Sequence, residues 1–171
     1  MENLSLIAAI GRNNELGRDN KLIWIIKEDL AFYRKYTIHE NIIMGRKTLE
    51  SMPSKALEER NVFVLSSQKL DAYYDVNSHT DIEELLKYIE INPDKHFIVV
   101  GGAQIYREFM PYVDTMYLTE IDEYAAADTF FPEIDMDDWD IETIYYNNER
   151  DYLDRNQIPY VRNRYVRKRV K

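Results

Sequence analysis

The hydrophobic and polar positions of this chain follow two patterns in turn, and these patterns predict alternating strands and helices. Short continuous apolar runs are typical of strands that are buried on both faces. Such runs lie at residues 4–11, 41–45, 61–67, 96–102 and 115–121, and a further short strand is expected at 72–76.

Stretches with helical spacing of apolar residues separate these strands. Helices are expected at residues 27–36, 46–52, 80–90 and 103–110. In TDIEELLKYIE, the third of them, apolar residues recur on one face and Thr80 is the expected N-terminal cap. Residues 12–22, RNNELGRDNKL, are rich in turn residues and long enough to form a functional loop.

The last third of the chain changes to a period of two. DWDIETIYYN (138–147) and IPYVRNRYVRKR (158–169) alternate apolar and polar residues across a polar stretch, so they are expected to form an antiparallel pair. The basic end, RNRYVRKRVK, is interpreted as an edge strand with a solvated face rather than a nucleic-acid patch, because tyrosine and valine interleave its charges.

Together these elements predict a single α/β domain over residues 1–171. Its central sheet is expected to be mixed but mostly parallel, with about eight strands, about four flanking helices and the antiparallel C-terminal pair. The formal net charge of −9 argues against phosphate-backbone binding by the surface as a whole. The absence of cysteine excludes disulfides, thiolate metal ligands and cysteine nucleophiles.

Other function classes find little support in the sequence. The N-terminal apolar run is too short for a membrane span and lacks the layout of a signal peptide, so a cytoplasmic protein is expected. His39, His79 and His96 lie far apart without ligand spacing, so no metal site is expected. No GxSxG motif occurs, which leaves serine hydrolase chemistry without support.

Asp29 is the first candidate functional residue, because it lies on the apolar side of its predicted helix. Its neighbours at helical spacing include Ile25 and Phe32. A buried, unpaired carboxylate is costly, so a partner or a function is required. The alternative is an ordinary first-turn acid stabilised by the helix dipole, although Glu28 fills that role more naturally. Thr119 is either an ordinary sheet threonine or a hydroxyl partner for the carboxylate.

Three strand ends carry residues suited to a phosphate-bearing ligand. Residues 46–48 (RKT), 66–67 (SS) and 101–103 (GGA) follow apolar runs, and ligands of open α/β sheets collect at the carboxyl ends of strands. The simpler interpretations are a tight turn at Gly101-Gly102 and an exposed first helical turn at Arg46 and Lys47. Neither GxGxxG nor GxxxxGK[ST] occurs, so no standard dinucleotide fingerprint or P-loop is present.

Several segments occur in an order that resembles one known family. They are SLIAAIG, a loop with Leu16-Gly17, Asn20 and Trp24, then EDLAFYRKYT, NIIMGRKTLESM, NVFVLSS, IVVGGAQIY, MYLTEID and DTFFP. Over essentially the whole chain, their order and spacing resemble dihydrofolate reductase. The resemblance implies reduction of 7,8-dihydrofolate to 5,6,7,8-tetrahydrofolate by NADPH for one-carbon metabolism, with hydride passing to pterin C6 and a proton to N5.

The resemblance also implies catalytic roles. Asp29 matches the acid whose two oxygens accept hydrogen bonds from a ring N–H and the amino group of the pterin. Thr119 matches the hydroxyl of the same network, and Trp24 matches the residue that holds an ordered water near it. Leu22 is expected to close over the nicotinamide and exclude solvent. Tyr106 is expected near the path of the hydride.

The resemblance supplies binding residues for both ligands. The substrate side, with an arginine for the glutamate tail, consists of Ile7, Ala8, Asp29, Leu30, Tyr33, Met52, Leu57, Arg60 and Thr119. The cofactor side, from the nicotinamide through the phosphates and adenosine to the pyrophosphate, consists of Ala9, Leu16, Gly17, Arg46, Lys47, Thr48, Ser66, Ser67, Gly101, Gly102, Ala103, Gln104, Ile105 and Tyr106. The peptide between the two adjacent glycines is expected to be cis.

Three segments depart from the family pattern. The family usually brackets the tryptophan with prolines, whereas residues 23–27 read IWIIK, so a less rigid loop is expected. PSKALEER (53–60) is one residue longer than the family's usual segment, which affects the matches of Leu57 and Arg60. Gln104 stands where a basic residue often meets the 2′-phosphate of NADPH, and Lys47 or Lys69 could compensate.

Two other functions remain open at this point. A pyrimidine reductase of riboflavin synthesis would share the cofactor-side strand ends but has no need of Asp29. A catalytically silent folate- or nucleotide-binding module fits the departures around Trp24. The expected partners are dihydrofolate and antifolate-type small molecules, with no nucleic acid and no membrane, and the expected state is a monomer.

Overall fold

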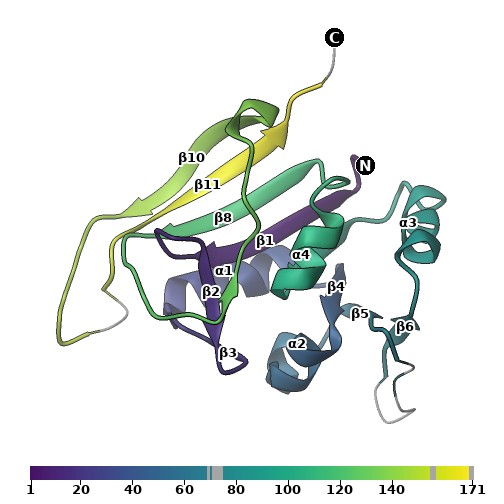
Figure 1. Ribbon diagram of the computed structural model, residues 1–171, viewed down its shortest axis with the longest axis horizontal. Helices are drawn as coiled ribbons and strands as arrows, with labels where there is room; N and C mark the ends of the chain where they lie inside the picture. Colours follow the sequence, from purple (N-terminus) through teal and green to yellow (C-terminus); the bar gives the residue numbers. More distant parts are fainter. Residues whose placement is uncertain (69, 71–74, 155–156, 170–171) are drawn as a thin grey trace.

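The computed structural model describes residues 1–68, 70, 75–154 and 157–169. Most of the strand expected at 72–76, and Lys69, lie outside the described residues. The main sheet has eight strands in the order β10-β11-β8-β1-β7-β4-β5-β6 (Figure 1). Their bounds are β1 Leu4–Ile10, β4 Asn41–Gly45, β5 Asn61–Leu65, β6 Asn77–His79, β7 Phe97–Gly101, β8 Thr115–Ile121, β10 Trp139–Asn147 and β11 Tyr160–Arg167.

The predicted mixed, mostly parallel sheet is confirmed. β8, β1, β7, β4, β5 and β6 pair in parallel, while β10 and β11 add antiparallel pairs. The inner parallel strands β1, β7, β4 and β5 are mostly apolar because both of their faces are covered, whereas the last strand, β6, is polar and largely exposed. Leu6 and Ile7, for example, are both buried although they point to opposite faces of β1.

In the described part of the chain, four helices cover the two faces of this sheet: α1 Lys27–Thr37, α2 Arg46–Ser51, α3 Ile82–Glu90 and α4 Ala103–Phe109. Apolar residues of α3 and α4 belong to one core cluster, and those of α1 and α2 belong to the cluster on the opposite face. Single 3-10 turns lie at Ser54–Ala56 and Met136–Asp138. No helix in the described part of the chain is long and apolar enough to cross a membrane.

The predicted cap of α3 was wrong by one residue. Asp81, not Thr80, is the N-terminal cap, and its Oδ1 accepts a hydrogen bond of 3.0 Å from the backbone N of Glu83. The carboxylate thereby satisfies one of the free N–H groups of the first turn, and its charge is favourable at the helix N-terminus.

The predicted functional loop at 12–22 contains part of a second, three-stranded sheet. β2 (Glu15–Arg18) pairs with β3 (Lys21–Leu22) and with β9 (Thr129–Phe130). The backbone N of Asp19 donates to Asp128 Oδ2 at 2.9 Å, and the backbone N of Asp128 donates to the carbonyl of Gly17 at 3.1 Å. The segment that carries Leu22 is therefore tied to a distant part of the chain.

The basic C-terminal strand is an inner strand, and its interpretation as an edge strand was wrong. β11 pairs with both β10 and β8, which leaves β10 at the edge (Figure 1). Its arginines have partners within the fold: Arg162 is 5% exposed, and Arg167 stacks 4.3 Å from the ring centroid of Trp139 while it donates to two carbonyls. The expected solvated face therefore holds for Arg164, Lys168 and Arg169, which are exposed, but not for the buried Arg162.

Candidate active site

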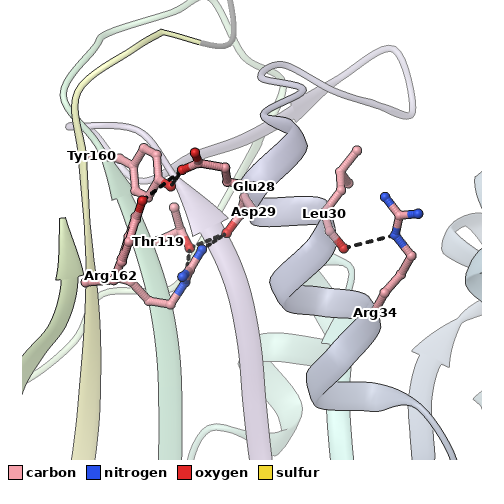
Figure 2. Close-up of polar contacts among 8 residues, drawn as sticks. Glu28, Asp29, Leu30, Arg34, Thr119, Tyr160 and Arg162 are labelled. Carbon is pink, nitrogen blue, oxygen red and sulfur yellow. Dashed lines mark hydrogen bonds and ion pairs between the residues drawn. The ribbon is translucent and has the colours of Figure 1, made fainter. Parts of the chain in front are cut away.

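Asp29, Thr119 and Arg162 form one hydrogen-bonded group between α1 and the sheet. Thr119 Oγ1 donates to Asp29 Oδ1 at 2.5 Å, and a terminal nitrogen of Arg162 lies 3.0 Å from the same oxygen. Arg162 Nε also donates to Thr119 Oγ1 at 3.3 Å. Figure 2 shows Arg162 reaching from β11 toward Asp29 on α1, with Thr119 beside them. The Asp29 carboxylate is thus paired, and its side chain is 22% exposed.

The sheet register explains why these residues meet. Thr119 on β8 and Arg162 on β11 are direct partners in the antiparallel ladder, and directly opposite residues project to the same face. α1 covers this face, so Asp29 in its first turn comes within reach. The Arg162 guanidinium also lies over the Phe32 ring, 3.9 Å from its centroid.

Tyr145, Tyr160 and Glu28 form a second hydrogen-bonded group next to Arg162. The hydroxyls of Tyr145 and Tyr160 donate to Glu28 Oε2 at 3.0 and 2.9 Å, and Figure 2 shows the contact of Tyr160. Burial raises the pKa of Tyr160 far above its usual value, and the neighbouring Glu28 carboxylate raises it further. Tyr160 therefore remains a hydrogen-bond donor across the physiological pH range.

Tyr106 contacts the neighbouring strands β1 and β7. Its hydroxyl lies 2.7 Å from the carbonyl of Ile7 and 2.9 Å from that of Val100, and burial strongly raises its pKa. The Gly101–Gly102 peptide is cis, as expected. A Cβ at Gly102 would lie 3.3 Å from Thr48 Oγ1, so α2 approaches this backbone closely.

The polar residues expected at the cofactor side are accessible at the strand ends. Arg46 and Lys47 are exposed in the first turn of α2, and Arg46 forms a 3.1 Å ion pair with Glu50. Gln104 is exposed and donates to Glu108 at 3.0 Å. Cations and amides at these positions fit the chemistry of a phosphate-bearing cofactor.

Several of the remaining cofactor-side residues line up along the strand ends. Ser66 and Ser67 directly follow β5, and Ala103 and Ile105 lie in α4. At the other end, Leu16 packs against the main core and Ala9 packs near Trp24. The residues expected around the nicotinamide and around the phosphates are thus distributed over neighbouring strands.

The apolar residues expected around a substrate ring mostly share one cluster. Ile7 is buried in it, and Tyr33, Met52 and Leu57 pack against it. Ala8 belongs to the cluster on the opposite face of β1, so its side chain is not brought together with the others. Leu30 follows Asp29 directly on α1 and is partly exposed.

Arg60 is largely engaged with the protein itself. Its Nε donates to Thr37 Oγ1 at 3.0 Å, and its terminal nitrogens donate to the carbonyls of Arg34 at 2.9 Å and Glu58 at 2.7 Å. A further carbonyl, that of Lys55, lies at 3.5 Å. These bonds tie the segment after α2 to the end of α1 and leave few N–H groups for a ligand.

Trp24 and Leu22 differ sharply in exposure. Trp24 is buried, and its Nε1 has no hydrogen-bond acceptor among the described residues. Leu22 is 59% exposed on β3. A buried indole N–H without a protein partner is compatible with a bound water.

Comparison with known proteins places the chain in a family. The model of the family "Dihydrofolate reductase" matches residues 3–167. The chain belongs to the dihydrofolate reductase family. A dihydrofolate reductase of Buchnera aphidicola (subsp. Schizaphis graminum) is 38% identical over 130 residues, which cover 76% of this chain and 79% of that protein. That of Bacillus subtilis is 36% identical over 138 residues, or 80% and 79% of the two chains.

A solved structure from the dihydrofolate reductase family has the same fold. Dihydrofolate reductase from Enterococcus faecalis, complexed with NADP(H) and RAB-propyl, has a TM-score of 0.84 and 30% sequence identity. The match covers 97% of this chain and 96% of that one. The described residues of the present family member contain no cluster of histidine, aspartate and glutamate that could hold a metal ion.

Sequence reasoning missed Arg162, which this member of the dihydrofolate reductase family places beside Asp29. Its charge was attributed to a solvated strand face. The available signal was the period of two, which puts Tyr160 and Arg162 on one face of their strand. The pairing of this strand with the one that carries Thr119 could not be read from the local pattern.

Proposed function

We propose that Asp29 binds the pterin ring of 7,8-dihydrofolate in this member of the dihydrofolate reductase family. The reaction is the NADPH-dependent reduction of 7,8-dihydrofolate to 5,6,7,8-tetrahydrofolate. The observation that supports the role of Asp29 is a carboxylate held by Thr119 and Arg162 at the edge of an apolar cluster. Among the described residues, none donates a hydrogen bond to its second oxygen, Oδ2.

Asp29 orients the ring by accepting hydrogen bonds. Thr119 and Arg162 fix Oδ1, so the carboxylate plane is set before the ligand arrives. Oδ2, together with the remaining capacity of Oδ1, accepts from the adjacent ring N–H and amino group of the pterin. A preset acceptor orients the ring at little further entropic cost.

The proton and the hydride arrive by separate routes. NADPH, when bound, supplies the hydride that is transferred to C6 of the pterin. Asp29 orients the ring for the proton transfer to N5, and water is the immediate proton donor. Trp24 Nε1, a buried donor without a protein acceptor among the described residues, holds an ordered water near this acid.

The apolar cluster contacts the rest of the substrate. Ile7, Tyr33, Met52 and Leu57 surround the pterin and the benzoyl ring, and Leu30 extends this wall along α1. The Ala8 contribution is limited to its backbone, since its side chain lies on the opposite face. Arg60 meets the glutamate tail with the N–H group that its bonds to the protein leave over.

The residues at the strand ends would hold the cofactor. Ala9, Leu16 and Gly17 would contact the nicotinamide, and Arg46, Lys47 and Thr48 would contact the phosphates. The serines after β5 would contact the adenosine end, the segment from Gly101 to Ile105 would contact the pyrophosphate, and Tyr106 would lie near the path of the hydride. Leu22, exposed on β3, closes over the nicotinamide once both ligands are bound.

We also propose that the enzyme is a cytoplasmic monomer that acts as one domain over residues 1–171. One sheet runs from Leu4 to Arg167 and supports the single domain. NADPH and reduced folates are metabolites of the cell interior. Antifolate-type small molecules are expected to compete with dihydrofolate at the Asp29 site. Light scattering at working concentration tests the monomer.

The activity is tested by following the near-ultraviolet absorbance of NADPH with dihydrofolate as substrate. The expected result is oxidation of NADPH that depends on dihydrofolate and yields tetrahydrofolate. A protein that binds both ligands without turnover would be a silent module. Turnover only with an aminopyrimidine precursor of riboflavin would point to the alternative reductase.

A further inference from the structure

Arg162 is a buried side chain at the candidate site whose hydrogen bond orients Asp29 but whose positive charge the proposed reaction does not need. Its side chain is 6% exposed, and two of its nitrogens donate to Asp29 and Thr119. An unpaired carboxylate would suffice to accept hydrogen bonds from a pterin. The presence of a guanidinium at the same oxygen therefore calls for a separate account.

Aromatic rings hold the guanidinium in place on its other sides. Its central carbon lies 3.9 Å from the Phe32 ring centroid, 5.5 Å from that of Tyr145 and 5.9 Å from that of Tyr160. The two tyrosines are fixed in turn by Glu28, which accepts from both hydroxyls. Stacking of this kind favours a planar, weakly hydrated cation, so Arg162 stays beside Asp29 when a ligand binds.

The pairing changes the charge that a bound ring meets. A lone Asp29 carboxylate would present a full negative charge and attract a ring that carries a proton. With Arg162 3.0 Å from Oδ1, the pair is close to neutral as a whole, and the guanidinium repels a second cation. A neutral ring still finds the acceptor Oδ2 and is not repelled.

We propose that Arg162 is a specificity-determining residue that makes the Asp29 site prefer an uncharged heterocycle over a ring that carries a proton. This inference rests on the proposed role of Asp29 as the ring-binding acid. It identifies the substrate class of the site as neutral, donor-rich rings such as a pterin. Weakly basic diaminopyrimidines, which become cations by gaining a proton, are the disfavoured class.

Charged and titratable groups face Arg162 from the surrounding elements. Asp29 and Glu28 face it from α1, Tyr145 from β10 and Tyr160 from its own strand, whereas β8 presents the hydroxyl of Thr119. Titration of any of these groups would change the binding of every ligand. A reference ligand with an uncharged ring therefore isolates the effect of a proton on the ligand itself.

The test compares two ligands with NADP⁺ bound, so that no turnover occurs. Folate has a ring that gains no proton in this pH range, whereas a 2,4-diamino-5-benzylpyrimidine is mostly neutral at about pH 8 and mostly protonated at about pH 6. The measured quantity is the ratio of the folate Kd to the diaminopyrimidine Kd at each pH. The variants are Arg162→Met, which removes the charge, Arg162→Lys, which keeps it, and Arg164→Met as the control. Arg164 lies on the same strand but is paired with Glu142 at the surface.

On lowering the pH, the ratio should rise at least about tenfold more in Arg162→Met than in the natural protein. Arg162→Lys and Arg164→Met should follow the natural protein. A rise in Arg162→Met within about twofold of the natural protein overturns the proposal, as does a Lys variant that behaves like the Met variant. If the effect of Arg162→Met came only from lost packing, Arg162→Lys would not keep the ratio of the natural protein.

Two further measurements keep the test decisive. If Arg162→Met does not fold, the natural protein is measured alone as the pH is lowered and the diaminopyrimidine gains its proton. A Kd ratio that rises about tenfold per pH unit contradicts the proposal, and a shallower rise supports it. Asp29→Asn separates the two levels of the account. Unchanged folate binding in that variant refutes the role of Asp29, whereas weakened folate binding with an unchanged Arg162→Met ratio refutes only the present proposal.

Discussion

Thr119 Oγ1 donates a 2.5 Å hydrogen bond to Asp29 Oδ1, although the two residues are 90 positions apart in the sequence. Because Arg162 Nε donates to the same hydroxyl, the threonine proton points toward the carboxylate. The hydroxyl therefore accepts from Arg162 and donates to Asp29, which fixes the orientation of the carboxylate.

Replacing Thr119 by valine should weaken catalysis without removing it. The hydrogen bond to a charged acceptor is lost, and kcat/KM for dihydrofolate should fall roughly tenfold, or about 1.4 kcal/mol. Thr115→Val is the matched control, because its hydroxyl lies on the same strand but contacts Asp114. Equal activity of the two variants would mean that Thr119 does not orient the acid.

Glu15 should prove important for stability. This carboxylate is 1% exposed and accepts hydrogen bonds from the backbone N of Asn13 at 2.5 Å and of Ala125 at 2.7 Å. In Glu15→Gln, the amide NH₂ faces one of these two N–H donors and cannot accept from it. The free energy of unfolding, measured in urea, should therefore fall by on the order of 1–3 kcal/mol. The exposed Glu133→Gln should change stability by less than about 0.5 kcal/mol. If Glu15→Gln is as stable as this control, the hydrogen bonds of Glu15 to Asn13 and Ala125 do not stabilise the fold.

His96 should make stability depend on pH. Burial lowers its pKa below the usual 6.5, while the Glu40 carboxylate, 3.6 Å away, opposes this shift. The unfolded chain then binds the proton at a higher pH than the folded chain. The stabilising contribution is therefore fully present above pH 6.5 and is lost as the pH falls from there through the lowered pKa.

The measurement compares melting temperatures between about pH 7.5 and about pH 5.5. The natural protein should lose more of its Tm over this range than His96→Gln, whatever the absolute stability of the variant. Parallel pH profiles would show that His96 does not carry this dependence.

Arg46 should contribute to the choice of cofactor. We expect kcat/KM to favour NADPH over NADH by at least about tenfold, because Arg46 and Lys47 present cationic side chains at the start of α2. Arg46→Gln should reduce the preference for NADPH by roughly three- to tenfold. The exposed ion pair with Glu50 holds the Arg46 side chain only weakly, so Arg46 is free to contact a phosphate. Arg107→Gln, at the far end of α4, is the control. Comparable values for both cofactors in the natural protein would refute the expected preference.

The sequence revealed those parts of the fold that depend on local pattern. Continuous apolar runs identified the parallel strands other than the polar β6, and the period of two identified β10 and β11. The pairing of β2 with β9 was not predictable, because Gly17 meets Thr129 across more than a hundred residues. For the same reason, the sequence did not show that β11 lies inside the sheet.

In the candidate site, too, some residues were predictable from the local pattern and others were not. Asp29 was identifiable because a carboxylate on an apolar helix face needs a partner, and Thr119 was among the partners considered. Arg162 was hidden in a run of basic residues, most of which are more exposed. Only the register between β8 and β11 separates it from Arg164, two residues further along the strand.

The role of Asp29 is tested most directly by the steady-state kinetics of Asp29→Asn. Asparagine keeps the shape but removes the charge, so kcat/KM for dihydrofolate should fall at least about 100-fold, or about 2.7 kcal/mol. Glu83→Gln, an acid in the first turn of α3, is the control and should retain its activity. A folded Asp29→Asn variant that binds NADPH and reduces dihydrofolate within about threefold of the natural rate would contradict the account.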